Sequence, residues 1–157
     1  MGTIRVVWGH ASAPTELAAY DAALAGAGIE NYNLVSVSSV IPAEATVEAV
    51  GTAPDLGPVG DLLTVVEARA TSGEGSVSAA LAWAESREGP GLFYETGGEF
   101  DGPTARERVE LGIAAGQRLR EWTFEEPSIV VESTEVPEGG YTCAVVVAVY
   151  GRGRPPF

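Results

Sequence analysis

The sequence of 157 residues contains no lysine: its nine basic residues are all arginine, they face 22 acidic residues, and the formal net charge is −13. A protein that binds nucleic acid through a basic surface needs the opposite balance, so this class of partner is excluded. The absence of lysine also excludes a pyridoxal phosphate enzyme, because that cofactor is held as a Schiff base on a lysine. If the protein performs amine chemistry through an imine, the carbonyl must come from elsewhere.

Cysteine and histidine are each present once. Cys143 lies inside an apolar run, which favours a small buried side chain over a redox or metal role. No zinc-ligand spacing exists, and we expect no metal. A Ser-His-Asp triad would have to use His10, which we expect in a loop after the first strand, and no G-x-S-x-G motif supports it.

Long hydrophobic segments are also missing. The longest apolar stretch, Cys143–Tyr150, is far too short to cross a membrane, so we expect no membrane partner. The N-terminus lacks a basic region followed by a long apolar one, as a secretory signal would have. We therefore expect one cytoplasmic domain, residues 1–157, which is long enough to bury a core.

The sequence order predicts a mixed α/β chain. Strands bounded by loops alternate with segments whose apolar residues recur at helical spacing. We expect helices at Pro14–Gly28, Ser76–Arg87 and Ala105–Trp122, the last opened by a capping box of Thr104 with Glu107, and strands at Ile4–Trp8, Asn33–Ser39, Asp61–Ala70, Gly91–Glu95, Ser128–Val136 and Thr142–Tyr150. The segment between residues 43 and 60 reads as a long irregular connection. Fully apolar strands beside alternating ones predict sheets packed on each other, with helices outside.

Two carboxylates stand out in this pattern. Asp21 falls at helical spacing between Leu17 and Leu24, on a face where a carboxylate is unusual. It either lies at the edge of the stripe with its head in water or meets a cationic ligand. Glu95 ends an apolar strand, where burial would raise its pKa and suit a general acid; the alternative is a solvated residue at a strand end.

The adjacent serines Ser38 and Ser39, in the stretch "VSVSSVIP", allow a specific reaction. A serine hydroxyl can attack the carbonyl of the preceding peptide bond and convert the amide to an ester. β-Elimination then cuts the chain and leaves dehydroalanine, which hydrolyses to a pyruvoyl group and ammonia. This reaction needs a well-held backbone at the bond and a donor for the oxyanion. It supplies the ketone that a chain without lysine lacks.

The block "AGIENYNLVSVSSVIP", Ala27–Pro42, together with "GLFYE" at Gly91–Glu95, resembles the pyruvoyl-dependent arginine decarboxylase family. The resemblance extends over nearly the whole chain; it departs at Ala43, where the family usually has a second proline. It implies a four-layer αββα sandwich. It also implies cleavage between Ser38 and Ser39 into a β chain (residues 1–38) and an α chain (residues 39–157) that begins with a pyruvoyl group made from Ser39. Three such αβ units would form a homotrimer with active sites between neighbours.

The resemblance further implies an activity and roles for single residues. L-arginine would form an imine with the pyruvoyl group, lose CO2 and be protonated to agmatine, a step of polyamine biosynthesis. Glu95 matches the proton donor, Asn33 an asparagine that assists processing, and Asp21 the carboxylate that receives the guanidinium group; Ser38 would join Asp21 in binding substrate. Two alternatives stay open: a pyruvoyl decarboxylase of another amino acid, and an uncleaved structural or regulatory relative.

The acidic composition leads to the first testable prediction. A surface with many carboxylates and no lysine repels itself at low ionic strength, and salt screens this repulsion, as in a protein from a halophilic source. We expect the temperature of thermal unfolding to rise between about 0.1 M and about 1 M KCl. Calorimetric scans across the series measure it, and an unfolding temperature independent of salt would contradict the halophilic interpretation.

Overall fold

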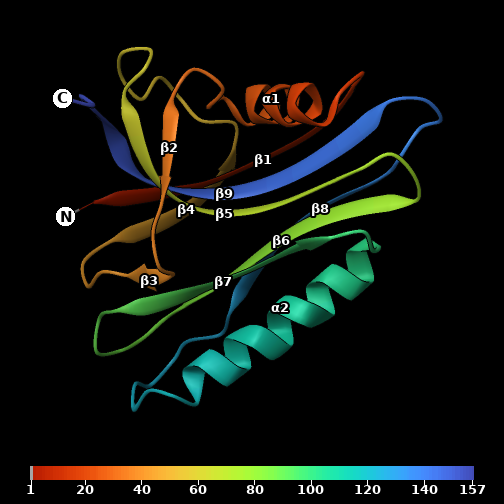
Figure 1. Ribbon diagram of the computed structural model, residues 1–157. Coiled ribbons are helices and arrows are strands. Elements are labelled where there is room, and N and C mark those ends of the chain that lie inside the picture. Colours follow the sequence, from red (N-terminus) through yellow and green to blue (C-terminus); the bar gives the residue numbers. More distant parts are fainter. Residues whose placement is uncertain (1) are drawn as a thin grey trace.

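A computed structural model, which describes residues 2–157, arranges two helices and two β-sheets in four layers (Figure 1). The elements, in chain order, are β1 (Thr3–Ala13), α1 (Glu16–Ala27), β2 (Asn33–Ser36), β3 (Val40–Ile41), β4 (Thr46–Gly51), β5 (Leu62–Ser72), β6 (Ser76–Glu85), β7 (Gly91–Gly98), α2 (Gly102–Gln117), β8 (Ser128–Glu135) and β9 (Tyr141–Arg154). The first sheet has the strand order β2-β5-β9-β1-β4 and the second has β3-β7-β6-β8. No helix of the described chain has the length and apolar character of a membrane span.

Three apolar clusters separate the four layers. The first lies between α1 and the first sheet, the second between the two sheets, and the third between the second sheet and α2. In Figure 1 the helices accordingly lie on the outer faces of the stacked sheets. The αββα sandwich is therefore confirmed.

Strand β9 lies at the centre of the first sheet and connects two of these clusters. Cys143, Val145 and Val147 face the α1 side, whereas Ala144 and Val146 face the second sheet. This confirms that an uninterrupted apolar strand is covered on both faces. Cys143 is fully buried, as its surroundings predicted, and burial raises the pKa of its thiol.

The helix expected at Ser76–Arg87 is wrong, because these residues form strand β6. This strand lies between β7 and β8, and α2 covers its outer face. Leu81 and Trp83 face the first sheet, while Ala80 and Ala82 face α2. Since both faces are buried, no polar residue marks a period of two between Ala79 and Ala84, and the spacing of the large residues suited a helix equally well.

Smaller corrections concern the ends of other elements. Strand β1 continues through His10, which therefore lies in a strand and not in a loop. Strand β4 forms within the segment expected to be irregular. Helix α2 is capped by Asp101, whose carboxylate accepts the backbone N–H of Thr104, so the expected capping box is not used. The helix ends at Gln117, which leaves Leu119 81% exposed.

Helix α1 packs closely on β1 because a glycine faces it. A Cβ added to Gly9 would lie 2.6 Å from the carbonyl oxygen of Ala23 and 3.1 Å from the nitrogen of Ala27. These are backbone atoms, which cannot turn aside as a side chain could.

The substitution Gly9→Ala should therefore push α1 away from the sheet. We expect it to lower the free energy of unfolding by about 1–3 kcal/mol, as overpacking does. Urea denaturation measures the loss. Gly2→Ala is the matched control, because nothing lies within 4 Å of its added Cβ; equal stability of the two variants would contradict the close packing of α1.

Candidate active site

The two adjacent serines lie where the chain passes from the first sheet to the second. Before them, β2 pairs in parallel with β5, and the N–H of Val37 extends this pairing to the carbonyl of Val65 at 3.0 Å. After them, β3 pairs with β7 of the other sheet, Val40 opposite Leu92. Ser38 and Ser39 therefore bridge two layers of the sandwich.

The backbone on the β3 side of this bridge is held by two further hydrogen bonds. The N–H of Phe93 donates to the carbonyl of Ser39 at 2.9 Å, and the hydroxyl of Tyr150 donates to the carbonyl of Val40 at 2.7 Å. Burial, with the nearby charge of Glu95 as a smaller cause, raises the pKa of Tyr150 to about 12. Its phenol thus stays protonated, and able to donate, at neutral pH.

The side chain of Ser39 is directed at Glu95. Its Oγ donates a hydrogen bond to Oε2 of Glu95 at 2.8 Å. Glu95 lies within β7, which continues to Gly98, and its side chain is exposed. The expectation that Glu95 ends a strand and is buried is therefore wrong for the single chain, although its contact with Ser39 is close.

Ser39 and Glu95 line a cavity of about 300 Å³, here called the serine cavity. The residues that line it are Ser38, Ser39, Val40, Leu92, Phe93, Tyr94, Glu95, Gly116 and Arg120. Arg120 supplies the positive charge: its Nη1 donates to the carbonyl of Gly116 at 2.9 Å, and its guanidinium lies 5.8 Å from the centre of the Trp122 ring. A guanidinium held in this way suits a carboxylate.

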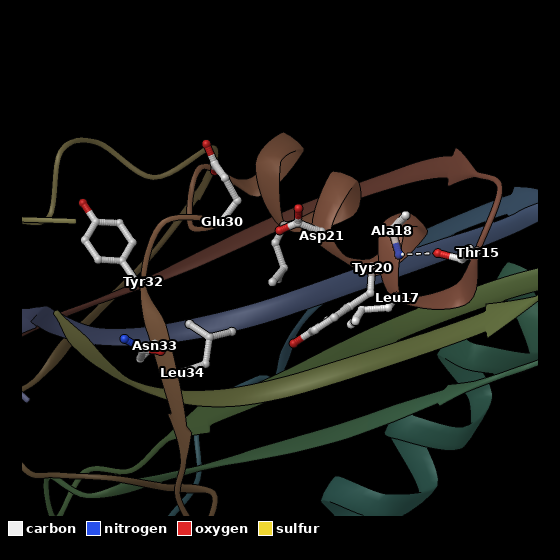
Figure 2. A pocket seen from close by; sticks show the side chains of 10 residues that line it. Thr15, Leu17, Ala18, Tyr20, Asp21, Glu30, Tyr32, Asn33 and Leu34 are labelled. Atoms are coloured by element: carbon white, nitrogen blue, oxygen red, sulfur yellow. Dashed lines mark hydrogen bonds between the residues drawn. The ribbon is translucent and has the colours of Figure 1, made fainter. Parts of the chain in front are cut away.

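A second cavity, of about 650 Å³, lies between α1 and β2 and is here called the α1 cavity (Figure 2). Asp21 and Glu30 bring carboxylates to it, and Asn33 and Tyr20 line it too. The prediction that Asp21 shares an apolar helix face with Leu17 and Leu24 is half correct, because Leu24 is buried but Leu17 is 75% exposed. Asp21 is itself exposed, so its carboxylate is accessible to a ligand in the groove.

Contacts to β5 hold Tyr20 in the wall of the α1 cavity. Its hydroxyl donates to Oε2 of Glu67 at 2.5 Å, and the guanidinium of Arg69 lies 4.5 Å from the centre of its ring. Burial, followed by the contact with Glu67, raises the pKa of Tyr20 well above its usual value. This network ties the start of α1 to the first sheet.

The structure divides the residues singled out in the sequence between the two cavities, which share no lining residue. Ser38, Ser39 and Glu95 meet in one, whereas Asp21 and Asn33 meet in the other. Asn33 was expected near the serine pair, but its Nδ2 donates to the carbonyl of Gly60 at 2.8 Å. The last paired residue before the serines is Val37. Extended chain from Asn33 to Val37 covers roughly 13 Å, which separates Asn33 from the serine pair.

Other residues at the site escaped the sequence interpretation. Nothing in the spacing marked Arg120 or Tyr150, because the packing of distant elements brings Arg120 to the serine cavity and Tyr150 to the carbonyl of Val40. His10 was considered for a triad, but its Nδ1 lies 3.4 Å from Oε2 of Glu132 on β8. It has therefore no contact with the serines that would support that chemistry.

Comparisons with known proteins identify the family of the chain. A family model described as pyruvoyl-dependent arginine decarboxylase matches residues 3–155. A protein of that name from Halobacterium salinarum is 54% identical over 158 residues, which cover 100% of this chain and 99% of the relative, and the acidic composition fits this relationship. Namesakes from Pyrococcus furiosus and Methanopyrus kandleri are 40% identical (86% of this chain, 85% of theirs) and 32% identical (92% and 93%). The chain therefore belongs to the pyruvoyl-dependent arginine decarboxylase family.

Proposed function

We propose that the chain cleaves itself between Ser38 and Ser39 and then decarboxylates L-arginine to agmatine and CO2. The observation that carries this proposal is the hydrogen bond from Ser39 Oγ to Glu95 inside the serine cavity. It places a carboxyl group beside the residue from which a pyruvoyl group would form. Relatives that align with the whole chain are named pyruvoyl-dependent arginine decarboxylases, which supports the choice of cofactor and substrate.

The residues of the serine cavity fit a pyruvoyl group at position 39. Ser39 lines the cavity, and its carbonyl is anchored by Phe93 on the side that would stay attached. When formed, the group supplies an electron-withdrawing ketone for the amine of the substrate. It needs no lysine, in keeping with the composition.

Glu95 is the proton donor in this proposal. A proton can be transferred directly over a heavy-atom separation of about 2.6–3.2 Å, and the oxygen of Glu95 lies 2.8 Å from Ser39 Oγ. The carboxyl group of Glu95 is thus within proton-transfer distance of the residue from which the pyruvoyl group would form. Glu95 can therefore supply the proton to the carbon that loses CO2, and hydrolysis of the imine by water would then release agmatine.

Asp21 is the receptor for the guanidinium group of arginine. Its exposed carboxylate in the α1 cavity can accept two parallel N–H donors, which a guanidinium presents and an ammonium does not. Because Asp21 and Glu95 line different cavities, we propose that the α1 cavity of one subunit completes the serine cavity of its neighbour. A homotrimer, as the family resemblance implies, provides such head-to-tail contacts in a closed ring.

Intact-mass spectrometry of the denatured protein, followed by measurement of CO2 release, tests the proposal. We expect two chains, one ending at Ser38 and one carrying a pyruvoyl group at position 39, and faster release from arginine than from lysine, ornithine, histidine or aspartate. Ser39→Ala, which has no attacking hydroxyl, is the control and should remain intact. An uncleaved wild-type chain would favour a non-catalytic relative, and equal rates would remove arginine as the preferred substrate.

Two impaired variants, assayed at an arginine concentration below KM, can test the composite site. Glu95→Gln keeps an oxygen that accepts the Ser39 hydroxyl, so it should self-cleave but turn over about 10²–10⁴-fold more slowly. Asp21→Asn should also self-cleave, but it loses one charged partner of the guanidinium, which should raise KM for arginine at least about tenfold.

Co-expression of the two variants should restore activity at about a quarter of the sites, because a random assembly pairs an intact α1 cavity with an intact serine cavity at that frequency. Mixing the variants after separate purification is the control for exchange between assemblies. Activity no higher than the sum of the two separate variants would place the whole site within one chain.

A further inference from the structure

The carbonyl oxygen of Ser38 belongs to the peptide bond that the proposed reaction breaks, and it accepts a hydrogen bond from within its own turn. The donor is the backbone N–H of Val40, at 2.8 Å. This bond spans three residues and closes a γ-turn around Ser39. Glu44 is the one non-glycine residue of the described chain with positive φ, so the turn at Ser39 is of the common inverse type.

The N–H of Val40 is available for this contact because the pairing of β3 with β7 does not use it. Val40 lies opposite Leu92, but across this pair the carbonyl of Ser39 accepts from Phe93, while the N–H of Val40 turns back to Ser38. The hydroxyl of Tyr150 holds the carbonyl of the same residue. Val40 is thus fixed from two sides, and its N–H is fixed with it.

We propose that the N–H of Val40 is the oxyanion donor of self-cleavage at Ser38–Ser39. This inference rests on the self-cleavage in the proposed function and adds to it the group that stabilises the charge. The Nδ2 of Asn33 donates to the carbonyl of Gly60, and no hydrogen bond joins it to Ser38 within the described chain. The backbone N–H of Val40 already donates to the carbonyl oxygen of Ser38.

The step that this contact assists is an acyl shift from nitrogen to oxygen. Oγ of Ser39 forms a bond to the carbonyl carbon of Ser38, and the carbonyl oxygen takes the electron pair of the broken π bond. The C–N bond then breaks as the carbonyl re-forms, and the proton lost by Oγ is balanced by one gained by the leaving nitrogen. An ester replaces the amide, with no change of oxidation state.

Negative charge develops on the carbonyl oxygen only while the carbon is tetrahedral. The hydrogen bond from Val40 becomes charge-assisted at that moment and is stronger than in the resting chain. An interaction that strengthens in the transition state accelerates the reaction, whereas one of constant strength does not. The donor is aligned before the reaction begins, so no reorganisation is needed.

The substitution Val40→Pro removes this N–H, and Val40→Ala is the matched control that keeps it. The Val40 side chain is 43% exposed, so its truncation should disturb little. Each protein is made by cell-free synthesis in concentrated salt, and the appearance of the two fragments is followed by mass spectrometry. We expect Val40→Pro to cleave about 10²-fold or more slowly than Val40→Ala, which keeps the N–H.

A second variant tests the same atom without proline's effect on the turn. Incorporation of α-hydroxyisovaleric acid at position 40 replaces the N–H by oxygen and keeps the side chain. We expect cleavage between residues 38 and 39 to slow by at least about tenfold, while the same replacement at Val59, which is 78% exposed in a loop, leaves the rate unchanged. The fragment masses distinguish this cleavage from hydrolysis of the introduced ester.

The outcomes separate this inference from the proposed function. A wild-type chain that stays intact contradicts self-cleavage and the role of Val40 together. A wild-type chain that cleaves, with the ester variant equally fast and folded by circular dichroism, overturns the role of Val40 alone. Slow cleavage of a folded ester variant supports it.

Discussion

The site depends on one constraint: the backbone around Ser38 and Ser39 is held by both sheets at once. Val37 is bonded to β5 in the first sheet, and Ser39 is bonded to β7 in the second. The apolar cluster between the sheets fixes the separation of these two anchors. The short bridge must therefore fold into a tight turn, and this turn brings a serine hydroxyl, a carboxylate and a backbone donor into one cavity.

The sequence was sufficient to predict the parts of this arrangement that have local causes. Proline and glycine bounded α1, which ends at Gly28 in the left-handed conformation, and the apolar run of β9 predicted a strand covered on both faces. The self-cleavage that the serine pair indicates stays a prediction. Strand β6 was missed because a strand buried on both faces has no polar alternation, and its alanines suit a helix. The division of the site between two cavities was not predictable, because it follows from the pairing of β2 and β3 with different sheets.

In the described chain, arginines pack over aromatic rings more often than they pair with carboxylates. Within residues 2–157 one arginine–carboxylate ion pair forms, Arg106 with Glu110. Other arginines lie over aromatic rings instead: Arg69 over Tyr20, Arg108 over Phe100 and Arg120 over Trp122. Salt weakens exposed ion pairs, but it does not remove the packing of a planar guanidinium against a ring. Such contacts suit a protein whose acidic composition predicts greater stability in concentrated salt.

The position of β1 determines whether the amino-terminal fragment leaves the molecule after the proposed cleavage. This strand lies inside the first sheet, where it pairs with β9 from Ile4 to Ala13 and with β4 on its other side. After the proposed cleavage the amino-terminal fragment would therefore stay in place, because its departure would open the sheet between β4 and β9. A molecule that folded as one chain would then persist as a complex of two. Refolding after denaturation would require the two fragments to meet, so the concentration of protein would enter the rate.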